Sequence, residues 1–361
     1  MTRIYIVRHC EAEGNACRRS QTNYEGTVTT KGIAQSEALR RRFHGEKIDA
    51  VYSSDSYRAR VTADPVAKDH GLLTKYRYLL REYRVGNWDG SANGNVYEDY
   101  PEVMKHNAEC PGDMWFPGGD TYGSIESRCR YILRQIAEEN PGKNVVVVSH
   151  ALTIRVLFAV ALGLPGDRVN EIPYGDNTAV SLIEYEDGKY NVRYMSDNSH
   201  LAPELQRAWS HDNLGEINLS IHRCSLPEDW NLMKGSRLFL SADEVKKAVA
   251  EDPDSVAVFS IKGAKCGYVA VAQKAFNGVD YIAVKEYSIN LPHDAAEFSL
   301  QAIGYALHLA RSRNILYITV PVPSNDIEEK VVGRFEFEPV PDVPGYLRLS
   351  TLIPPCEYPV I

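Results

Sequence analysis

The chain has 361 residues, of which 44% are hydrophobic and 24% are charged, and its formal net charge at pH 7 is −8. At about 150 residues per domain this length predicts two domains, and the apolar content suffices for a core in each. A single small module and a largely disordered chain are therefore excluded. Acidic residues outnumber basic ones in both halves, so we expect neither nucleic acid nor a membrane as a partner.

Cysteine usage and apolar runs predict a cytoplasmic protein. The seven cysteines are scattered and include no Cys-x-x-Cys pair that would bind zinc or perform redox chemistry. Residues 1–7 resemble a β-strand and lack the long apolar core of a signal peptide. The longest apolar helical stretch, 156–164, is too short to cross a bilayer. We expect reduced thiols and no membrane span.

Strands and helices alternate in the first half of the chain, in the order strand 4–7, helix 29–43, strand 50–53, helix 57–69, helix 125–139, strand 144–148 and hairpin 179–195. Four consecutive valines at 145–148 lack the alternation of a half-exposed strand and indicate one buried on both faces of a parallel sheet. The pattern predicts an α/β domain at 1–203, with a doubly wound, mostly parallel sheet and helices on both faces.

The second half has a different pattern. A polar stretch at 204–229 lacks periodicity and is interpreted as a linker. The domain at 230–361 follows with helix 241–250, strands 256–261, 267–272 and 281–289, helix 295–313, strand 315–320, helix 327–332, and strands 335–338 and 347–350. This order predicts an α+β domain and not a second doubly wound sheet.

Two predicted strands of the first domain end in histidines. His9 follows Arg8 at the end of the first strand, and His150 follows the four-valine strand and Ser149. Ligands of open α/β sheets bind beyond the carboxyl ends of the strands, so both imidazoles are expected at the functional edge. A single histidine in such a place is more often structural, and it is the pair that indicates a site.

Two arginines and a glutamate extend this candidate site. Arg8 and Arg58, near the start of the helix after the second strand, supply forked donors that match the oxygens of a phosphate. Glu82 precedes a turn-rich run at 86–90, and a carboxyl group shielded by that loop could pass a proton to a leaving oxygen. Taken singly, each charge is more often a solvated residue or an ion-pair partner.

The motifs carry a family resemblance. Residues 8–15 read Arg-His-Cys-Glu-Ala-Glu-Gly-Asn, which resembles the Arg-His-Gly-Glu-Thr-x-x-Asn signature of the histidine phosphatase superfamily, the phosphoglycerate mutase-like fold. Further segments resemble the family's other motifs in the family's order, at 27–32, 53–63, 80–90, 117–121 and 147–150. Several motifs in register across about 200 residues form a specific signal.

The resemblance implies a role for each candidate residue. His9 would attack phosphorus and form a phosphohistidine, while Glu82 would protonate the leaving oxygen and then activate water. The phosphoryl oxygens would be held by Arg8, Asn15, Arg58 and His150. No metal and no cofactor are expected, because the cationic clamp supplies the charge that a metal supplies elsewhere.

The chain departs from the family signature beside the nucleophile. Cys10 replaces the usual glycine and Ala12 the usual threonine, which adds bulk at one position and removes a hydroxyl at the other. One hypothesis is that the neighbouring guanidinium groups lower the pKa of the Cys10 thiol and make the enzyme sensitive to oxidation. The alternative is a buried, inert thiol.

Two features favour a phosphatase over a mutase. Mutases of the family usually carry Glu-Arg-His-Tyr-Gly after the acid and a longer insert before the second histidine, whereas here Glu82 is followed by Tyr-Arg-Val-Gly and the interval to His150 is short. The predicted function is hydrolysis of small phosphate monoesters, with a small phosphorylated metabolite as partner. The alternatives are a phosphoglycerate-type mutase and a regulatory protein that recognises a phosphorylated partner.

The second domain loosely resembles a GNAT-type acyltransferase in the order of its elements and in Asn325 before a short helix. That family binds coenzyme A pyrophosphate through a glycine-containing loop at the start of the long helix. The corresponding stretch here, 290–298, contains no glycine and two acidic residues, which compete with a phosphate for the helix N-terminus. We therefore prefer a degenerate domain over one that binds acyl-CoA. Its expected role is structural, substrate-gating or dimer-forming, and the last of these would give a homodimer.

Overall fold

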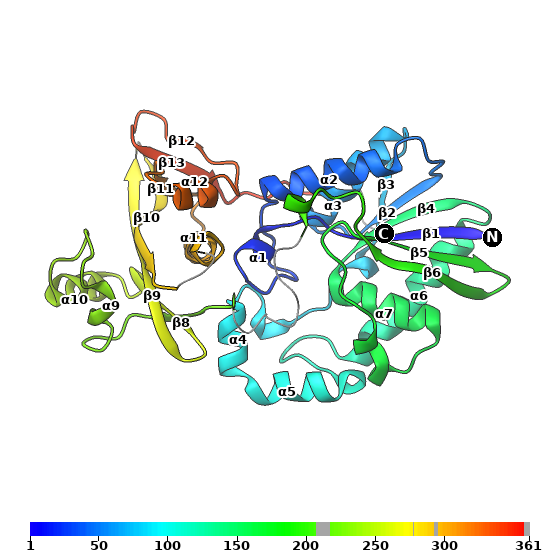
Figure 1. Ribbon diagram of the computed structural model, residues 1–361, viewed down its shortest axis with the longest axis horizontal. Coiled ribbons are helices and arrows are strands. Elements are labelled where there is room, and N and C mark those ends of the chain that lie inside the picture. The colour runs from blue at the N-terminus through cyan, green and yellow to red at the C-terminus, as the bar shows by residue number, and fades with distance from the viewer. Residues whose placement is uncertain (207–216, 277, 292–294, 357–361) are drawn as a thin grey trace.

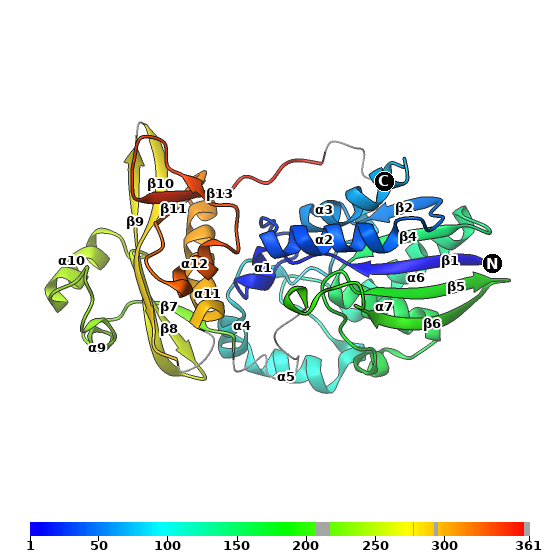
Figure 2. The ribbon, with the colours of Figure 1, turned by 45° about the horizontal axis from the view of Figure 1, so that its top comes forward.

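The computed structural model describes residues 1–206, 217–276, 278–291 and 295–356 (Figure 1). The two β-sheets are separated along the long axis, and helices α1 (Glu13–Ala16) and α11 (Ala295–Ser312) meet between them (Figures 1 and 2). Within the described ranges, no helix has both the length and the apolar character needed to cross a membrane.

The first sheet has six strands in the order β3-β2-β4-β1-β5-β6. Its strands are β1 (Thr2–Arg8), β2 (Ala50–Ser53), β3 (Thr74–Tyr76), β4 (Asn144–Ser149), β5 (Val180–Glu186) and β6 (Lys189–Asp197). β1 to β4 pair with one another in parallel, whereas β5 is antiparallel to both β1 and β6, and β5 and β6 form the predicted hairpin at one edge. The sheet is therefore mixed, with a parallel majority.

Helices cover both faces of this sheet, which explains the valine run of β4. Val146 and Val148 pack with α2 (Thr30–Phe43) and α3 (Tyr57–Asp69), whereas Val145 and Val147 pack on the opposite face with α6 (Tyr122–Glu139) and α7 (Ala151–Leu162). Since both faces are buried, successive side chains of the strand are all apolar. The α/β fold predicted for this region is confirmed.

The segment between α3 and α6 contains elements that the sequence pattern does not reveal. Besides β3 it holds α4 (Asn93–Asp99) and α5 (Pro101–Glu109), and α5 buries none of its side chains. This segment also contains short 3-10 turns at Tyr78–Leu80, Gly86–Trp88 and Pro111–Asp113. Two further 3-10 turns, at Gly166–Glu171 and Pro203–Leu205, occur after α7 in the chain. Without a buried face there is no apolar periodicity from which to predict such a helix.

The second sheet has seven strands in the order β12-β13-β11-β10-β9-β8-β7. They are β7 (Ser220–Arg223), β8 (Val256–Ile261), β9 (Ala264–Phe276), β10 (Val279–Ile289), β11 (Tyr317–Pro321), β12 (Glu338–Pro339) and β13 (Tyr346–Ser350). Only β10 and β11 pair in parallel among these strands. Helices α11 and α12 (Asp326–Val332) share one core with the sheet, and α9 (Trp230–Met233) and α10 (Ala242–Glu251) pack on a separate core.

Two predicted boundaries differ from the structure. Strand β7 pairs with β8 and lies inside the stretch 204–229 that the sequence indicates as a linker, so the second sheet begins before residue 230. Residues 207–216 of that stretch lie outside the described residues. The predicted strand 335–338 is reduced to β12, because the chain after α12 continues in a turn in which Phe335 N–H donates to the Val332 carbonyl.

The two regions meet at the loop that follows His9. Arg334 forms a two-pronged ion pair with Glu11, at 2.7 and 2.9 Å, and Arg311 of α11 forms another with Glu13, at 2.5 and 2.7 Å. Gly304 faces Cys17 so closely that an added Cβ atom would lie 2.5 Å from the Cys17 Cβ. The second region therefore packs directly against the segment 11–17.

Candidate active site

His9 lies immediately after β1 and is only 5% exposed. Its Nδ1 is 2.7 Å from the Cys10 carbonyl oxygen. A carbonyl can only accept, so Nδ1 carries the proton and Nε2 presents a lone pair. Burial, and then the charges of Arg58 and Arg8, hold the pKa of His9 well below 6.5. His9 is thus a neutral imidazole, the form able to act as a nucleophile.

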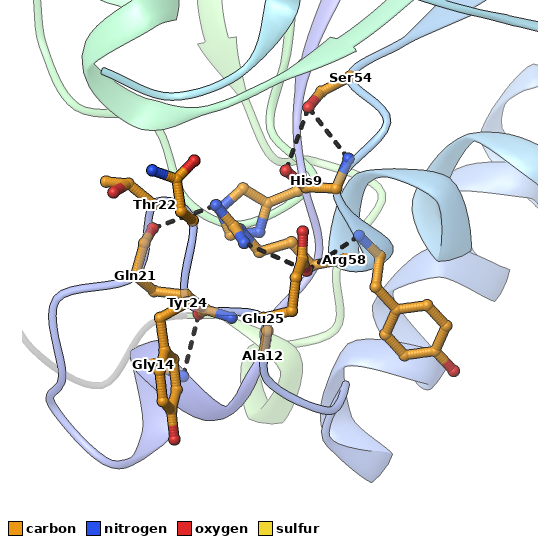
Figure 3. Close-up of polar contacts among 12 residues, drawn as sticks. His9, Ala12, Gly14, Gln21, Thr22, Tyr24, Glu25, Ser54 and Arg58 are labelled. Carbon is orange, nitrogen blue, oxygen red and sulfur yellow. Dashed lines mark hydrogen bonds and ion pairs between the residues drawn. The ribbon is translucent and has the colours of Figure 1, made fainter. Parts of the chain in front are cut away.

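Arg58 stands beside His9 in the first turn of α3 and is 1% exposed. Its Nη2 donates to the Gln21 carbonyl at 3.1 Å, and its Nη1 lies 3.9 Å from Glu25 Oε2. No described residue accepts a hydrogen bond from Nη1. In Figure 3 the side chains of Arg58 and His9 lie next to each other, with Gln21 and Glu25 close to the guanidinium group. A buried cation with an unused donor suits an anionic ligand.

His150 is also buried, and its ring centroid lies 5.0 Å from that of His9. Arg58 Nη2 donates to its Nδ1 at 3.2 Å, and its Nε2 is 2.8 Å from Ser54 Oγ. Burial, with the charge of Arg58, lowers the pKa of His150 well below 6.5. Both ring nitrogens have protein partners, so in this geometry His150 orients Arg58. Contact with a phosphoryl oxygen requires an exchange of one of these partners.

Glu82 is anchored at the N-terminus of α7. Its Oε1 accepts from the Thr153 N–H and hydroxyl, both at 3.0 Å, and its Oε2 accepts from the Leu152 N–H at 3.1 Å. Burial lowers the pKa of Arg58, whereas the charges of Glu25 and then Glu82 raise it. The carboxyl group is thus held by N–H donors at the start of a helix.

Arg8 and Asn15, the two remaining predicted residues, are only partly buried. Arg8 Nη1 donates to the Gly175 carbonyl at 2.7 Å, and its charge helps to lower the pKa of His9. Asn15 lies in α1, where its Oδ1 accepts from the Ala12 N–H at 3.1 Å. Of the six predicted site residues, direct contacts join His9, Arg58 and His150. The phosphate-binding roles of Arg8 and Asn15 stay predictions.

The hypothesis of a reactive Cys10 is wrong. The side chain is fully buried, its Sγ lies 3.7 Å from the Arg58 carbonyl oxygen, and burial raises the pKa of the thiol to about 12. The positive charge of Arg58 does lower the pKa of the thiol, but the desolvation of a buried thiolate raises it by more. Cys10 is the inert thiol of the alternative reading.

One part of the site was missed by sequence reasoning. Residues 20–26 lie over Arg58, and Asp89 holds this segment by accepting hydrogen bonds from Thr22 N–H and Oγ1 and from the N–H groups of Asn23 and Tyr24, at 2.7 to 3.1 Å. The only sequence signal is that Asp89 sits in a turn-rich run, where aspartate commonly accepts from backbone N–H groups. Its partners are more than 60 residues away.

Comparisons with known proteins agree with this architecture. The Histidine phosphatase superfamily (branch 1) profile matches residues 4–198. Phosphoserine phosphatase 1 of Hydrogenobacter thermophilus is 28% identical over 56% of this chain and 95% of its own length. Phosphoglycerate mutase-like protein 4 of Arabidopsis thaliana is 32% identical over 55% of this chain and 86% of its own length. Among solved structures, Bacillus stearothermophilus YhfR aligns with a TM-score of 0.53 at 27% identity, over 55% of this chain and 99% of its own.

Proposed function

We propose that this chain, which belongs to branch 1 of the histidine phosphatase superfamily, is a metal-independent phosphatase of small phosphate monoesters. Membership makes it a phosphatase or mutase, and several relatives are named for one of these activities. The observation that carries the finer proposal is the pairing of a neutral His9 with the buried Arg58, whose Nη1 is unused among the described residues.

The reaction would proceed in two displacements. His9 Nε2 attacks phosphorus and the bond to the ester oxygen breaks, while Glu82 donates a proton to the departing oxygen. Water then attacks the phosphohistidine, Glu82 accepts a proton from it, and inorganic phosphate leaves with the histidine restored. Arg8, Asn15, Arg58 and His150 would bind the phosphoryl oxygens, whose negative charge spreads in the transition state.

The resting geometry prepares each step. The Cys10 carbonyl fixes the tautomer of His9, and the N-terminus of α7 fixes the carboxyl group of Glu82. Guanidinium groups provide permanent positive charge in a buried setting, where charge interactions are stronger than in water. This chemistry needs no metal ion, because the cations that surround the phosphoryl group are side chains.

For the second region we propose a GNAT-like domain that includes β7 and so begins before the predicted boundary at residue 230, following a phosphatase domain at 1–203. The parallel pair β10–β11, with α11 between them in sequence, supports this assignment. The preferred role is structural, and acyl-CoA binding or dimerisation are the alternatives. We place the protein in the cytoplasm, acting on a small phosphorylated metabolite.

The test is release of inorganic phosphate from a panel of monoesters in the presence of EDTA, for the wild type and His9→Ala side by side. We expect turnover that survives chelation and disappears in the variant. Transfer of a labelled phosphoryl group between two acceptors without phosphate release would favour the mutase. Turnover that EDTA abolishes would contradict the proposal.

A further inference from the structure

We propose that the leaving group of the substrate carries a planar aromatic ring, which binds in a cavity next to Glu82. The proposal rests on the proposed phosphatase function and adds the chemical class of the alcohol. It also assigns a substrate-binding role to Asn218, which lies outside the segment 4–198 matched by the family.

The cavity adjoins the candidate site through residues that contact Glu82. Its volume is about 750 Å³. Tyr83 and Leu152 line it, and their N–H groups donate to the two oxygens of Glu82. Ser20, directly before the residue whose carbonyl accepts from Arg58, lines another part of it. An ester with phosphorus at His9 and its bridging oxygen at Glu82 would therefore extend its alcohol into this cavity.

The walls suit a flat, largely apolar group. Tyr83 stacks on Phe116 with ring centroids 4.5 Å apart, and Trp88 meets Phe116 edge-on at 5.4 Å. The Cζ atom of Arg155 lies 4.1 Å from the centroid of the Tyr174 ring, so its planar guanidinium group adds a further flat surface to the wall. Cavities of this size accommodate ligands much larger than a short hydroxy acid, and aromatic walls gain most from a ring that stacks on them.

Two buried polar atoms in the wall lack a partner among the described residues. They are Trp88 Nε1, a donor, and Asn218 Oδ1, an acceptor on a side chain that is only 6% exposed. Unpaired buried polar groups are costly, and they confer specificity when a ligand satisfies them. The ring is therefore expected to carry polar substituents or ring heteroatoms, as a heteroaromatic ring does.

The second region of the molecule holds Asn218 in place. Gln301 of α11 accepts from the Leu219 N–H at 2.9 Å and donates to the Ile217 carbonyl at 2.9 Å. These two bonds clamp the backbone on either side of Asn218. The backbone at Asn218 is thus positioned by α11, although Asn218 lines a cavity of the phosphatase region.

The test compares esters that share a primary alkoxide leaving group and differ in the ring: adenosine 5′-monophosphate with ribose 5-phosphate, and 2-phenylethyl phosphate with ethyl phosphate. We expect kcat/KM to be about ten- to a hundredfold higher for the ring-bearing member of each pair, the range for stacking of one ring on aromatic side chains. Equal values within both pairs would overturn the proposal while leaving the phosphatase function intact.

Binding provides a readout that does not depend on turnover. Calorimetry with the His9→Ala variant should show tighter binding of adenosine 5′-monophosphate than of ribose 5-phosphate, even if no ester is hydrolysed. Asn218→Ala should reduce the ratio of the affinity for adenosine 5′-monophosphate to that for ribose 5-phosphate. Asn191→Ala, at an exposed asparagine of β6, should leave this ratio unchanged. If both esters bind equally to His9→Ala, or if Asn218→Ala retains the full preference, the assignment fails.

Discussion

The polar cluster around His9 and the aromatic cavity beside Glu82 differ in the structural elements that supply their residues. His9, Arg58 and His150 follow or flank strands of the first sheet and interact through charge and hydrogen bonds. The cavity takes its walls from irregular segments, short helices and a residue held by α11. The reaction can thus remain constant while the leaving group is chosen by loops and by the second region.

Replacing Arg58, the buried cation of the polar cluster, should lower kcat to a similar extent for every ester. Arg58→Ala is expected to lower kcat by about 10³- to 10⁵-fold, the range for an arginine that stabilises charge in phosphoryl transfer. Steady-state kinetics on ring-bearing and ring-free esters would measure this loss. Arg60→Ala is the matched control on the same helix, because that side chain donates to carbonyls at Pro354 and Pro355. A loss confined to one class of ester would break the distinction between cluster and cavity.

Glu82 lies between the polar cluster and the aromatic cavity, so the effect of replacing it should depend on the leaving group. Glu82→Gln is expected to lower kcat on alkyl phosphates by about 10²- to 10⁴-fold, because the alkoxide needs a proton. With p-nitrophenyl phosphate the phenolate leaves unaided, so a stopped-flow trace should show a fast first turnover followed by slow hydrolysis of the phosphohistidine. An equally slow first turnover on both esters would argue against proton donation by Glu82.

The loop after His9 should depend on the second region for stability. Glu13 is 0% exposed, and Arg311→Leu removes its two-pronged partner, which should cost about 3–5 kcal/mol of unfolding free energy. Arg313→Leu, just beyond the same helix, breaks pairs between partly exposed groups and should cost about 1 kcal/mol or less. Urea denaturation would measure both. Equal costs would show that the buried pair has no special importance.

Acid should weaken the fold through the two site histidines. Burial holds the pKa of His9 and of His150 well below 6.5 in the folded state, so below pH 6.5 the unfolded chain binds more protons. Stability is therefore expected to fall as the pH drops below 6.5, by at most about 1.4 kcal/mol per pH unit for each histidine. Urea titrations between pH 7 and 5 would show a smaller slope in His150→Gln than in the wild type, and an equal slope would contradict this prediction.

Much of the polar cluster could be predicted because strand ends and motif spacing determine it. His9 and His150 follow neighbouring parallel strands, and such strands bring their carboxyl ends to one edge. The raised pKa of the Cys10 thiol could not be predicted in this way, because it depends on burial that the sequence does not show. Strand β7 was hidden for a related reason: it is short and pairs with a strand more than 30 residues away.

The cavity was the least predictable part of the site. Its aromatic residues are scattered through a segment of short helices, one of which, α5, buries none of its side chains, so no periodicity marks them. The interaction of Asp89 with the loop at 22–24 and the clamp of Gln301 around Asn218 join positions far apart in the chain. Such contacts follow from the packed structure and leave no local pattern in the sequence.

The most direct test of the account is to trap the covalent intermediate. The wild type would be mixed with an ester carrying labelled phosphate in the presence of EDTA, quenched in base and digested for peptide mapping. If His9 is the nucleophile, the wild type carries a base-stable, acid-labile phosphoryl group on His9 that is absent from His9→Ala and disappears as phosphate is released. Rapid turnover with no labelled protein at any time, or label on another residue, would contradict it.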